Sequence, residues 1–174
     1  MFTKIAVATD GSPLAGKAVE TAIALARQCG AELAVFHVLM HGEPPESLKR
    51  MAEVEHLVTT HPNVEVALHT LPGPMISARA DVERHRLDHQ IIATIGDMII
   101  KQAKEKAVDG GVASVSGETL EGETSDEILA AAKRIEADLI VLGTRGLNPL
   151  KGLFVGSVSQ KVSQRAECAC LIVK

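Results

Sequence analysis

The 174-residue sequence contains no tryptophan and no tyrosine, and it has only three phenylalanines. Proteins that bind single-stranded nucleic acids stack bases on aromatic side chains, so this composition offers few stacking platforms. The formal net charge of -4 supplies no basic surface for a polyphosphate backbone. We therefore expect no general nucleic-acid binding.

Long hydrophobic runs are also lacking. No stretch approaches the roughly 20 apolar residues of a membrane span, and the N-terminus is typical of a strand rather than of a signal peptide. Cys168 and Cys170 are two residues apart in a strand-like run. This spacing is too short for a disulfide framework, and we favour two buried small side chains over a redox pair. These features predict a soluble, cytoplasmic protein without membrane association.

Segments typical of strands alternate with segments typical of helices. Strands are expected over residues 3–9, 33–39, 112–115, 138–143 and 170–173, and helices over residues 14–28, 79–107, 125–136 and 157–166. Ser12 and Pro13 suit the start of the first helix, and Thr124 with Glu127 forms a capping box for the third. The alternation predicts one α/β domain over residues 1–174, with an open parallel sheet and helices on both faces.

The segment around residues 41–111 is long for a single connection and enlarges this domain. A helix over residues 43–60 and a short strand over residues 64–68 are expected before the break at residues 72–74. Further on, His85, Asp88 and His89 have the helical spacing that could hold a divalent metal. Because such residues are common on polar helix faces, we favour a solvated face and assign no metal site.

The chain after the strand that ends at Gly143 has the pattern of an anion-binding loop. Gly143 and Gly146 permit close backbone approach or a positive φ, and Gly156-Ser157 places amide groups at a helix N-terminus. The hydroxyls of Ser157 and Ser159 and the charges of Arg145 and Lys151 could add contacts to phosphate. The alternative is that these glycines only end a strand and precede a helix, where glycine is common. Neither the Walker pattern nor the dinucleotide fingerprint occurs.

Asp10 follows the first strand, at the edge of the sheet where open α/β proteins bind ligands. A carboxylate at this position could accept hydrogen bonds from ribose hydroxyls or help to hold Mg²⁺. Since Asp before Gly-Ser is also ordinary turn chemistry, both interpretations stay open at this point.

Gly143, Gly146, Gly156 and Ser157 together reproduce the pattern G-x2-G-x9-G-[ST]. In this pattern the sequence resembles the ATP-binding type of the universal stress protein family. The segments 5–12, 36–38, 137–143 and 168–173 are also similar to that family, and the resemblance covers residues 1–40 and 118–174. It implies an open, parallel five-stranded sheet of the adenine nucleotide alpha hydrolase-like, Rossmann-like type.

The resemblance further implies ATP, with Mg²⁺, as the bound cofactor. The positions that match the family's nucleotide-contacting residues are Ala8, Asp10, Val38, Gly143, Arg145, Gly146, Gly156, Ser157, Val158 and Ser159. A homodimer through the C-terminal strand is implied as well. Because Ala169 stands where the family often has proline, the exact dimer mode stays open.

Three functions follow from this resemblance. We favour a nucleotide-dependent regulatory or signalling protein of the stress response, with a protein partner that the sequence does not identify. The alternative is a slow Mg²⁺-dependent ATPase or related adenine-nucleotide hydrolase. No residue is placed by linear spacing as a general base, so no catalytic residue is assigned. A protein-only interaction module is the third possibility, and the intact glycine pattern argues against it.

Overall fold

The computed structural model describes residues 1–39, 73–144 and 156–174. The chain divides into two compact units, one made of residues 1–39 with 96–174 and the other of residues 40–95. The expected helix at 43–60, the expected strand at 64–68, and the loop residues Arg145 and Gly146 lie outside the described residues. The assignment of the whole chain to a single domain stays a prediction.

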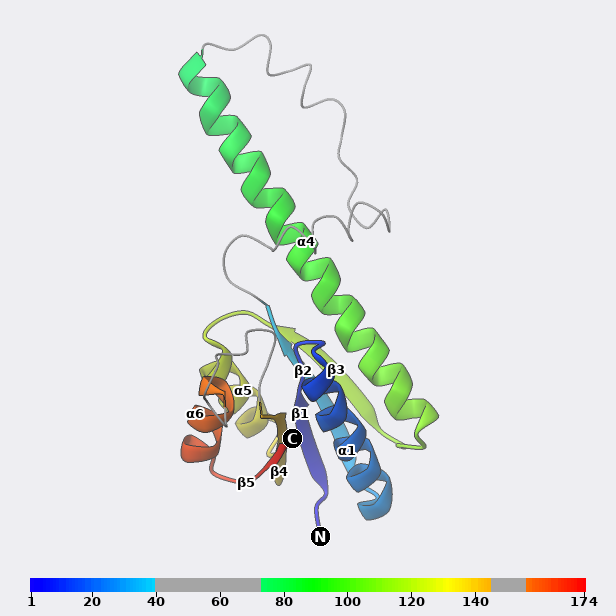
Figure 1. Ribbon diagram of the computed structural model, residues 1–174. Coiled ribbons are helices and arrows are strands. Elements are labelled where there is room, and N and C mark those ends of the chain that lie inside the picture. Colours follow the sequence, from blue (N-terminus) through cyan, green and yellow to red (C-terminus); the bar gives the residue numbers. More distant parts are fainter. Residues whose placement is uncertain (40–72, 145–155) are drawn as a thin grey trace. The chain divides into compact units, whose positions relative to one another are not determined.

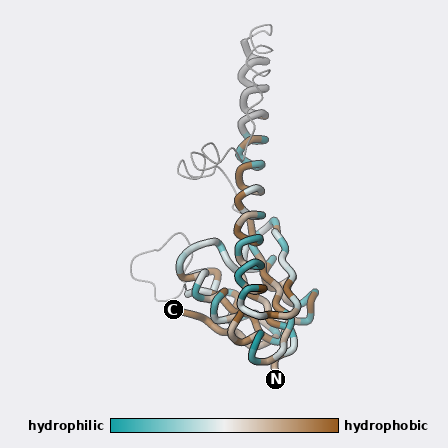
Figure 2. The backbone as a smooth tube through the Cα atoms, turned by 90° about the vertical axis from the view of Figure 1, so that its right-hand side faces the viewer, coloured by the Kyte–Doolittle hydropathy of each residue, from teal (hydrophilic) through white to brown (hydrophobic). Residues whose placement is uncertain are grey.

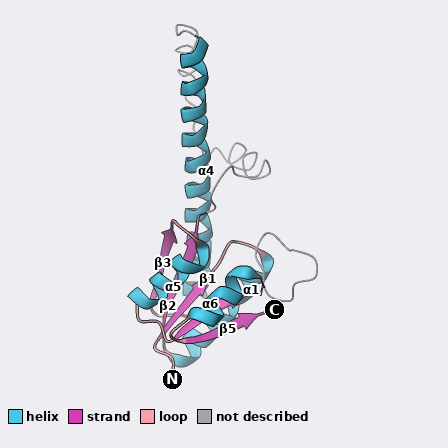
Figure 3. Cartoon of the chain, turned by 90° about the vertical axis from the view of Figure 1, so that its left-hand side faces the viewer, coloured by secondary structure: helices cyan, strands magenta, loops and turns pink. Residues whose placement is uncertain are grey.

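The first unit contains a five-stranded sheet in which every neighbouring pair is parallel (Figure 3). Its strands are β1 (Lys4–Ala8), β2 (Glu32–Val38), β3 (Val115–Leu120), β4 (Leu139–Gly143) and β5 (Ala169–Val173), in the order β3-β2-β1-β4-β5. The chain moves outward from β1 on one side, then returns to build the other side. This arrangement confirms the predicted open parallel sheet.

Helix α1 (Pro13–Cys29) follows the local signals in its sequence. Ser12 caps its N-terminus by accepting a hydrogen bond from the Ala15 amide, and Pro13 occupies the first turn. Gly30 ends the helix with φ 66°, a left-handed conformation that glycine adopts without steric penalty. The predicted helix is therefore confirmed, with ends shifted by one residue.

The remaining helices are α4 (Gly73–Asp109), α5 (Thr124–Arg134) and α6 (Ser157–Arg165). The long α4 includes the helix expected over residues 79–107. Hydrophobic and hydrophilic residues alternate along its described part, as Figure 2 shows. None of the helices in the described part of the chain is both long and apolar enough to cross a membrane.

Helices cover both faces of the sheet (Figure 1), and an apolar core lies on each face. On one face, α1 and the part of α4 from Ile100 to Ala107 pack against alternate strand residues such as Val7 and Val35. On the other face, α5 and α6 pack against residues such as Phe36 and Ile140. Burial of both faces explains why β1, β2 and β4 are almost continuously apolar.

Two local predictions were wrong. The strand expected at 112–115 lies later, at Val115–Leu120, because Gly111 turns the chain at φ 82° and the strand itself alternates between exposed and half-buried residues at the sheet edge. The capping box of Thr124 and Glu127 does not form. Instead Glu123 is the N-cap, because its carboxylate accepts a hydrogen bond from the Asp126 amide at 2.9 Å.

Candidate functional site

A cavity of about 120 Å³ lies at the carboxyl ends of β1, β2 and β4. Strand residues form its floor, and the first turns of α1, α5 and α6 contribute to its wall. The lining residues are Ala8, Thr9, Asp10, Ala15, Phe36, Val38, Thr124, Ile128, Leu142, Gly143, Val158 and Ser159. The cavity thus lies at the sheet edge where open parallel sheets bind ligands.

The structure brings six of the sequence-predicted site residues together around this cavity. They are Ala8, Asp10, Val38, Gly143, Val158 and Ser159. Gly156 and Ser157 immediately precede Val158, as the N-cap and the first residue of α6. Arg145 and Gly146 belong to the undescribed segment 145–155.

Sequence reasoning missed the contribution of α5. Thr124 and Ile128 line the cavity from its first turns, although α5 follows β3, at the far side of the sheet from β4 and α6. No local signal marks these two residues as site residues, because their placement depends on the crossover. Thr9 and Phe36, by contrast, adjoin the predicted Ala8, Asp10 and Val38 and could have been found from strand pairing.

The turn that carries Asp10 is held by a set of hydrogen bonds. Asp10 Oδ1 accepts from the Ser12 amide at 3.0 Å, and Thr9 Oγ1 accepts from the Gly11 amide at 3.2 Å. The Thr9 amide donates to the Phe36 carbonyl of β2. The turn interpretation of Asp10 is therefore correct, and it is compatible with ligand binding because the same side chain lines the cavity.

Gly143 has a structural role of its own. A Cβ atom on this residue would lie 3.0 Å from the carbonyl carbon and oxygen of Leu14 and 3.1 Å from the Ala15 nitrogen. No positive φ is recorded at Gly143, so the requirement for glycine comes from its close approach to the backbone of α1. This contact brings the end of β4 directly against the first turn of α1.

Two hydrogen bonds tie the end of β4 to the start of α6. The Gly156 amide donates to the Thr144 carbonyl at 2.6 Å, and the Ser159 hydroxyl donates to the Gly143 carbonyl at 2.7 Å. The Ser159 hydroxyl, which we expected to be a phosphate donor, therefore gives its proton to the protein and could serve a ligand only as an acceptor.

The N-terminus of α6 lacks a side-chain cap. Gly156 has φ -69° and ψ 155°, a conformation open to any residue, so its backbone does not require glycine. The first-turn amides of a helix have no intrahelical carbonyl partner and carry the positive end of the helix dipole. This N-terminus is accordingly suited to receive an anion.

Charged residues connect the two helices that flank the cavity. Glu123, just before α5, accepts hydrogen bonds from the Ser125 hydroxyl at 2.6 Å and from Lys161 of α6 at 3.0 Å. These bonds, with that from the Asp126 amide, lower the pKa of Glu123 to about 2. The carboxylate therefore remains ionised at neutral pH and links the beginning of α5 to α6.

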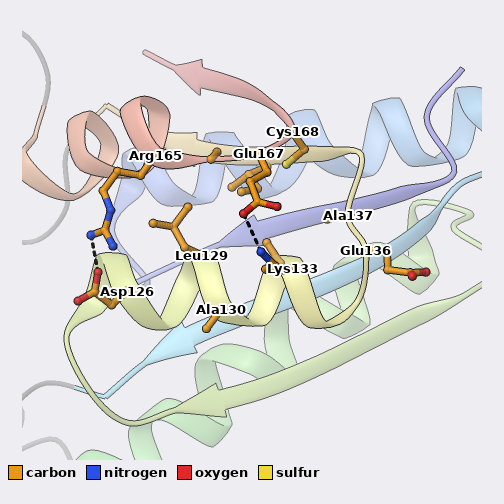
Figure 4. Close-up of a pocket in the computed structure, with 12 residues that line it drawn as sticks. Asp126, Leu129, Ala130, Lys133, Glu136, Ala137, Arg165, Glu167 and Cys168 are labelled. Carbon is orange, nitrogen blue, oxygen red and sulfur yellow. Dashed lines mark hydrogen bonds and ion pairs between the residues drawn. The ribbon is translucent and has the colours of Figure 1, made fainter.

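A larger hollow of about 600 Å³ lies on the outer side of α5, next to α6 and the start of β5 (Figure 4). It contains none of the predicted site residues. Ion pairs cross it between Asp126 and Arg165 and, at 2.7 Å, between Lys133 and Glu167. Cys168 lies at its edge, and burial raises the pKa of the Cys168 thiol, which disfavours a reactive thiolate. We therefore place the candidate site in the smaller cavity.

The three α4 residues with metal-ligand spacing differ in their exposure. His85 and His89 are exposed, whereas Asp88 is buried, so the three residues do not form the uniformly solvated face that we expected. Among residues 1–39, 73–144 and 156–174, no three histidine, cysteine or acidic side chains gather closely enough to hold a metal ion.

The strand order and the position of the cavity define an α/β protein of the adenine nucleotide alpha hydrolase-like class. The chain belongs to the universal stress protein family, whose model matches residues 1–174. It is 36% identical to universal stress protein YxiE of Bacillus subtilis over 176 residues, with all of both chains covered.

Solved structures agree with the fold. The universal stress protein UspA from Lactobacillus plantarum gives a TM-score of 0.67 at 22% identity and covers 99% of this chain and 97% of its own. A universal stress protein solved in complex with cAMP gives 0.61 at 23% identity, with 99% and 97% covered. One from Archaeoglobus fulgidus in complex with dAMP gives 0.58 at 20% identity, with 99% and 98% covered.

Proposed function

We propose that this protein binds ATP, with Mg²⁺, and acts as a nucleotide-dependent regulatory protein of the stress response. The observation that carries the proposal is the convergence of residues from β1, β2, β4 and α6 on one cavity. These residues are distant in the sequence, and the family pattern assigns them to one nucleotide.

The cavity fits the nucleoside part of the ligand better than the whole nucleotide. Its volume of about 120 Å³ is small beside the roughly 300–1,000 Å³ of usual ligand pockets. Apolar atoms of Ala8, Val38 and Leu142 provide a surface for a flat base, and Asp10 provides an acceptor for ribose hydroxyls. The base and ribose therefore occupy this cavity in the proposed complex.

The phosphates extend along the N-terminus of α6. The amides of Ser157, Val158 and Ser159 lie in the first turn, where donors and the helix dipole both favour negative charge. Arg145 and Gly146, which lie outside the described residues, also contact the phosphates in this proposal. Mg²⁺ would neutralise phosphate charge, and the Asp10 carboxylate, which lines the cavity, would be a candidate ligand for it.

Two relatives of known structure carry an adenine nucleotide, one cAMP and the other dAMP. Both ligands share the adenine ring with ATP and carry a single phosphate, which is a cyclic diester in cAMP, while dAMP has deoxyribose in place of ribose. They support adenine as the common element of recognition. The number of phosphates is the part of our proposal that rests on the glycine pattern and the helix N-terminus.

Equilibrium binding by purified protein, freed of carried-over nucleotide, tests the proposal. We expect ATP to bind more tightly than ADP and AMP, because each phosphate adds hydrogen bonds at α6. We also expect cAMP to bind measurably. Mass analysis of nucleotide released from freshly purified protein should identify ATP. No binding of any adenine nucleotide would exclude the function, and a preference for cAMP would exclude ATP as the principal ligand.

A turnover assay separates a binding protein from a slow ATPase. We expect ATP to be retained with little product over many hours in the presence of Mg²⁺. Repeated turnover that Asp10→Asn abolishes would instead establish hydrolysis, because a carboxylate that holds Mg²⁺ or orients water is lost in that variant.

The same proposal includes a homodimer through β5, which is an edge strand of the sheet. The Ala169 amide donates to the carbonyl of Asp138, the residue before β4, so by alternation the amides of Cys170 and Ile172 face the open edge. Light scattering should report a dimer for the wild-type protein and a monomer for Ile172→Lys. A wild-type monomer at tens of micromolar protein would contradict the proposed assembly.

A further inference from the structure

His37 is a buried polar residue whose side chain lies on the other face of the sheet from the candidate cavity. It is 6% exposed and precedes the cavity residue Val38 on β2. Its neighbours at alternate positions, Leu33 and Val35, belong to the core formed with α1 and α4. A polar side chain in this apolar layer requires a hydrogen-bond partner, since an unpaired buried group costs free energy.

That partner is the carbonyl oxygen of Thr9, which lies 2.8 Å from His37 Nδ1. A carbonyl only accepts, so Nδ1 carries the proton and donates. Thr9 is itself only 8% exposed. The hydrogen bond therefore lies in the protein interior, and it joins two residues that are 28 positions apart in the chain.

The carbonyl of Thr9 is part of the peptide group that leads into Asp10. Its orientation sets the direction in which the chain leaves β1 and presents the Asp10 side chain to the cavity. Within the turn, the side chains of Thr9 and Asp10 accept hydrogen bonds from the amides of Gly11 and Ser12. The His37 ring adds a hydrogen bond from β2 to this peptide group.

The ring is also held from its opposite edge. A Cβ atom placed on Gly96 of α4 would lie 3.0 Å from His37 Cδ2, so the ring packs closely against the helix at a residue without a side chain. Ile99, one turn further along α4, lies against the turn itself, because a Cβ atom on Gly11 would be 3.2 Å from its Cδ1. The ring consequently has little freedom to rotate away from Thr9.

We infer that His37 is a positioning residue for the nucleotide, which acts by fixing the Thr9–Asp10 peptide group and through it the Asp10 carboxylate. The inference rests on the proposed adenine-nucleotide function. It assigns to His37 an effect on affinity without any contact with the ligand, which distinguishes it from the lining residues on the other face of the sheet.

A matched pair of variants separates the hydrogen bond from packing. In His37→Asn an amide nitrogen can take the place of Nδ1, whereas His37→Leu has nearly the same shape as His37→Asn and no donor. We expect ATP affinity to fall about ten-fold in His37→Leu, a change typical of one lost hydrogen bond, and about three-fold or less in His37→Asn. Equal losses in both variants would overturn the inference, because the ring volume and not the donor would then matter.

A double-mutant cycle tests the route through Asp10. In an Asp10→Ala background, His37→Leu should lower ATP affinity by less than about two-fold, because the group that it positions has been removed. An undiminished ten-fold loss in that background would show that His37 acts on the site independently of Asp10, and the inference would be wrong.

Hydrogen exchange of the ligand-free protein decides the matter without nucleotide. The Gly11 and Ser12 amides should exchange at least about ten-fold faster in His37→Leu than in His37→Asn. Equal rates would overturn the positioning role even if ATP binds. Conversely, a wild-type protein that binds no adenine nucleotide would refute the proposed function, while this comparison would still decide whether His37 restrains the turn.

Where His37→Leu does not fold, the wild-type ring supplies the answer. Nitrogen chemical shifts of His37 should report a proton on Nδ1. A proton on Nε2 alone would remove the donor to Thr9 and overturn the inference.

Discussion

At the amino ends of the strands, Asp138 accepts three hydrogen bonds through a single oxygen, from the Thr3 amide and hydroxyl at 2.6 Å and from the Lys4 amide at 2.9 Å. At the carboxyl ends, Asp10 forms a hydrogen bond within its own turn and lines a cavity. Both carboxylates lie beside β1. Asp138 bonds to backbone and side-chain donors of the protein, whereas Asp10 borders the cavity.

The amino end of β1 therefore contributes to the stability of the fold, and its carboxyl end contributes to the candidate binding site. Protein donors surround Asp138 and lower its pKa to about 2, so its charge is used within the fold. Around the cavity, the floor is apolar. The amide groups at the N-terminus of α6 have no side-chain cap. A ligand with an apolar ring and negative charge would complement that edge.

The largest expected effect on ATP affinity comes from a larger side chain at Gly156, at the carboxyl ends of the strands. We expect Gly156→Val to weaken ATP binding by at least about 100-fold, because its branched side chain would occupy the position proposed for phosphate. Since φ at Gly156 is -69°, the backbone can accept valine and the loss should be steric. Titration with ATP measures the loss, and thermal unfolding should show little change.

Gly16→Val is the matched control for this substitution. Gly16 lies in α1 with open space around its Cβ position, and it does not line the cavity. ATP affinity should remain within about two-fold of wild type. If Gly156→Val also retained wild-type affinity, the N-terminus of α6 would no longer be a credible phosphate site.

A second substitution, at Gly143, should lower both the stability of the fold and the affinity for ATP. Gly143→Ala places a methyl group about 3.0 Å from backbone atoms of Leu14, which cannot move as a flexible side chain does. We expect a loss of about 1–3 kcal/mol in the free energy of unfolding, together with weaker ATP binding. Chemical denaturation measures the first effect. An unchanged midpoint would mean that the first turn of α1 yields readily.

The sequence predicted those parts of the fold that depend on neighbouring residues. Ser12 and Pro13 set the start of α1 by local chemistry, and their roles were found where expected. By contrast, β3 is an edge strand of alternating polar residues without a continuous apolar run, so its position was misjudged. At α5, local spacing favoured Thr124 as the cap, but Glu123 lies where its longer side chain reaches Asp126 and Lys161.

Some residues of the candidate site could likewise be predicted from the sequence, and others could not. Residues in the family pattern, such as Asp10 and Gly143, could be assigned before the fold was known, and they meet at the cavity. Thr124 and Ile128 could not, because a crossover from the far side of the sheet brings them there. The hydrogen bond between His37 and Thr9 was equally hidden, because it joins two residues that are 28 positions apart in the chain.

The smallest expected effect is a pH dependence at the amino edge. Hydrogen bonds from the Thr3 hydroxyl, the Thr3 amide and the Lys4 amide lower the pKa of Asp138 from 3.8 to about 2. A carboxyl with a lowered folded-state pKa stabilises the fold fully above its unfolded pKa, near 4, and loses that contribution as the pH falls through about 2. Asp138→Asn should therefore be less stable than wild type at pH 7.

Denaturant unfolding between pH 2 and pH 7 would show this difference narrowing only below about pH 4. Glu136→Gln is the matched control, because the Glu136 side chain is 85% exposed and contacts Lys4 at 3.4 Å, a surface pair of little expected value. Its stability should follow that of wild type at every pH. A gap for Asp138→Asn that stayed constant down to pH 2 would mean that shape, rather than charge, makes Asp138 important. ATP binding by either variant should be unaffected at pH 7, since both residues lie at the edge of the sheet away from the cavity.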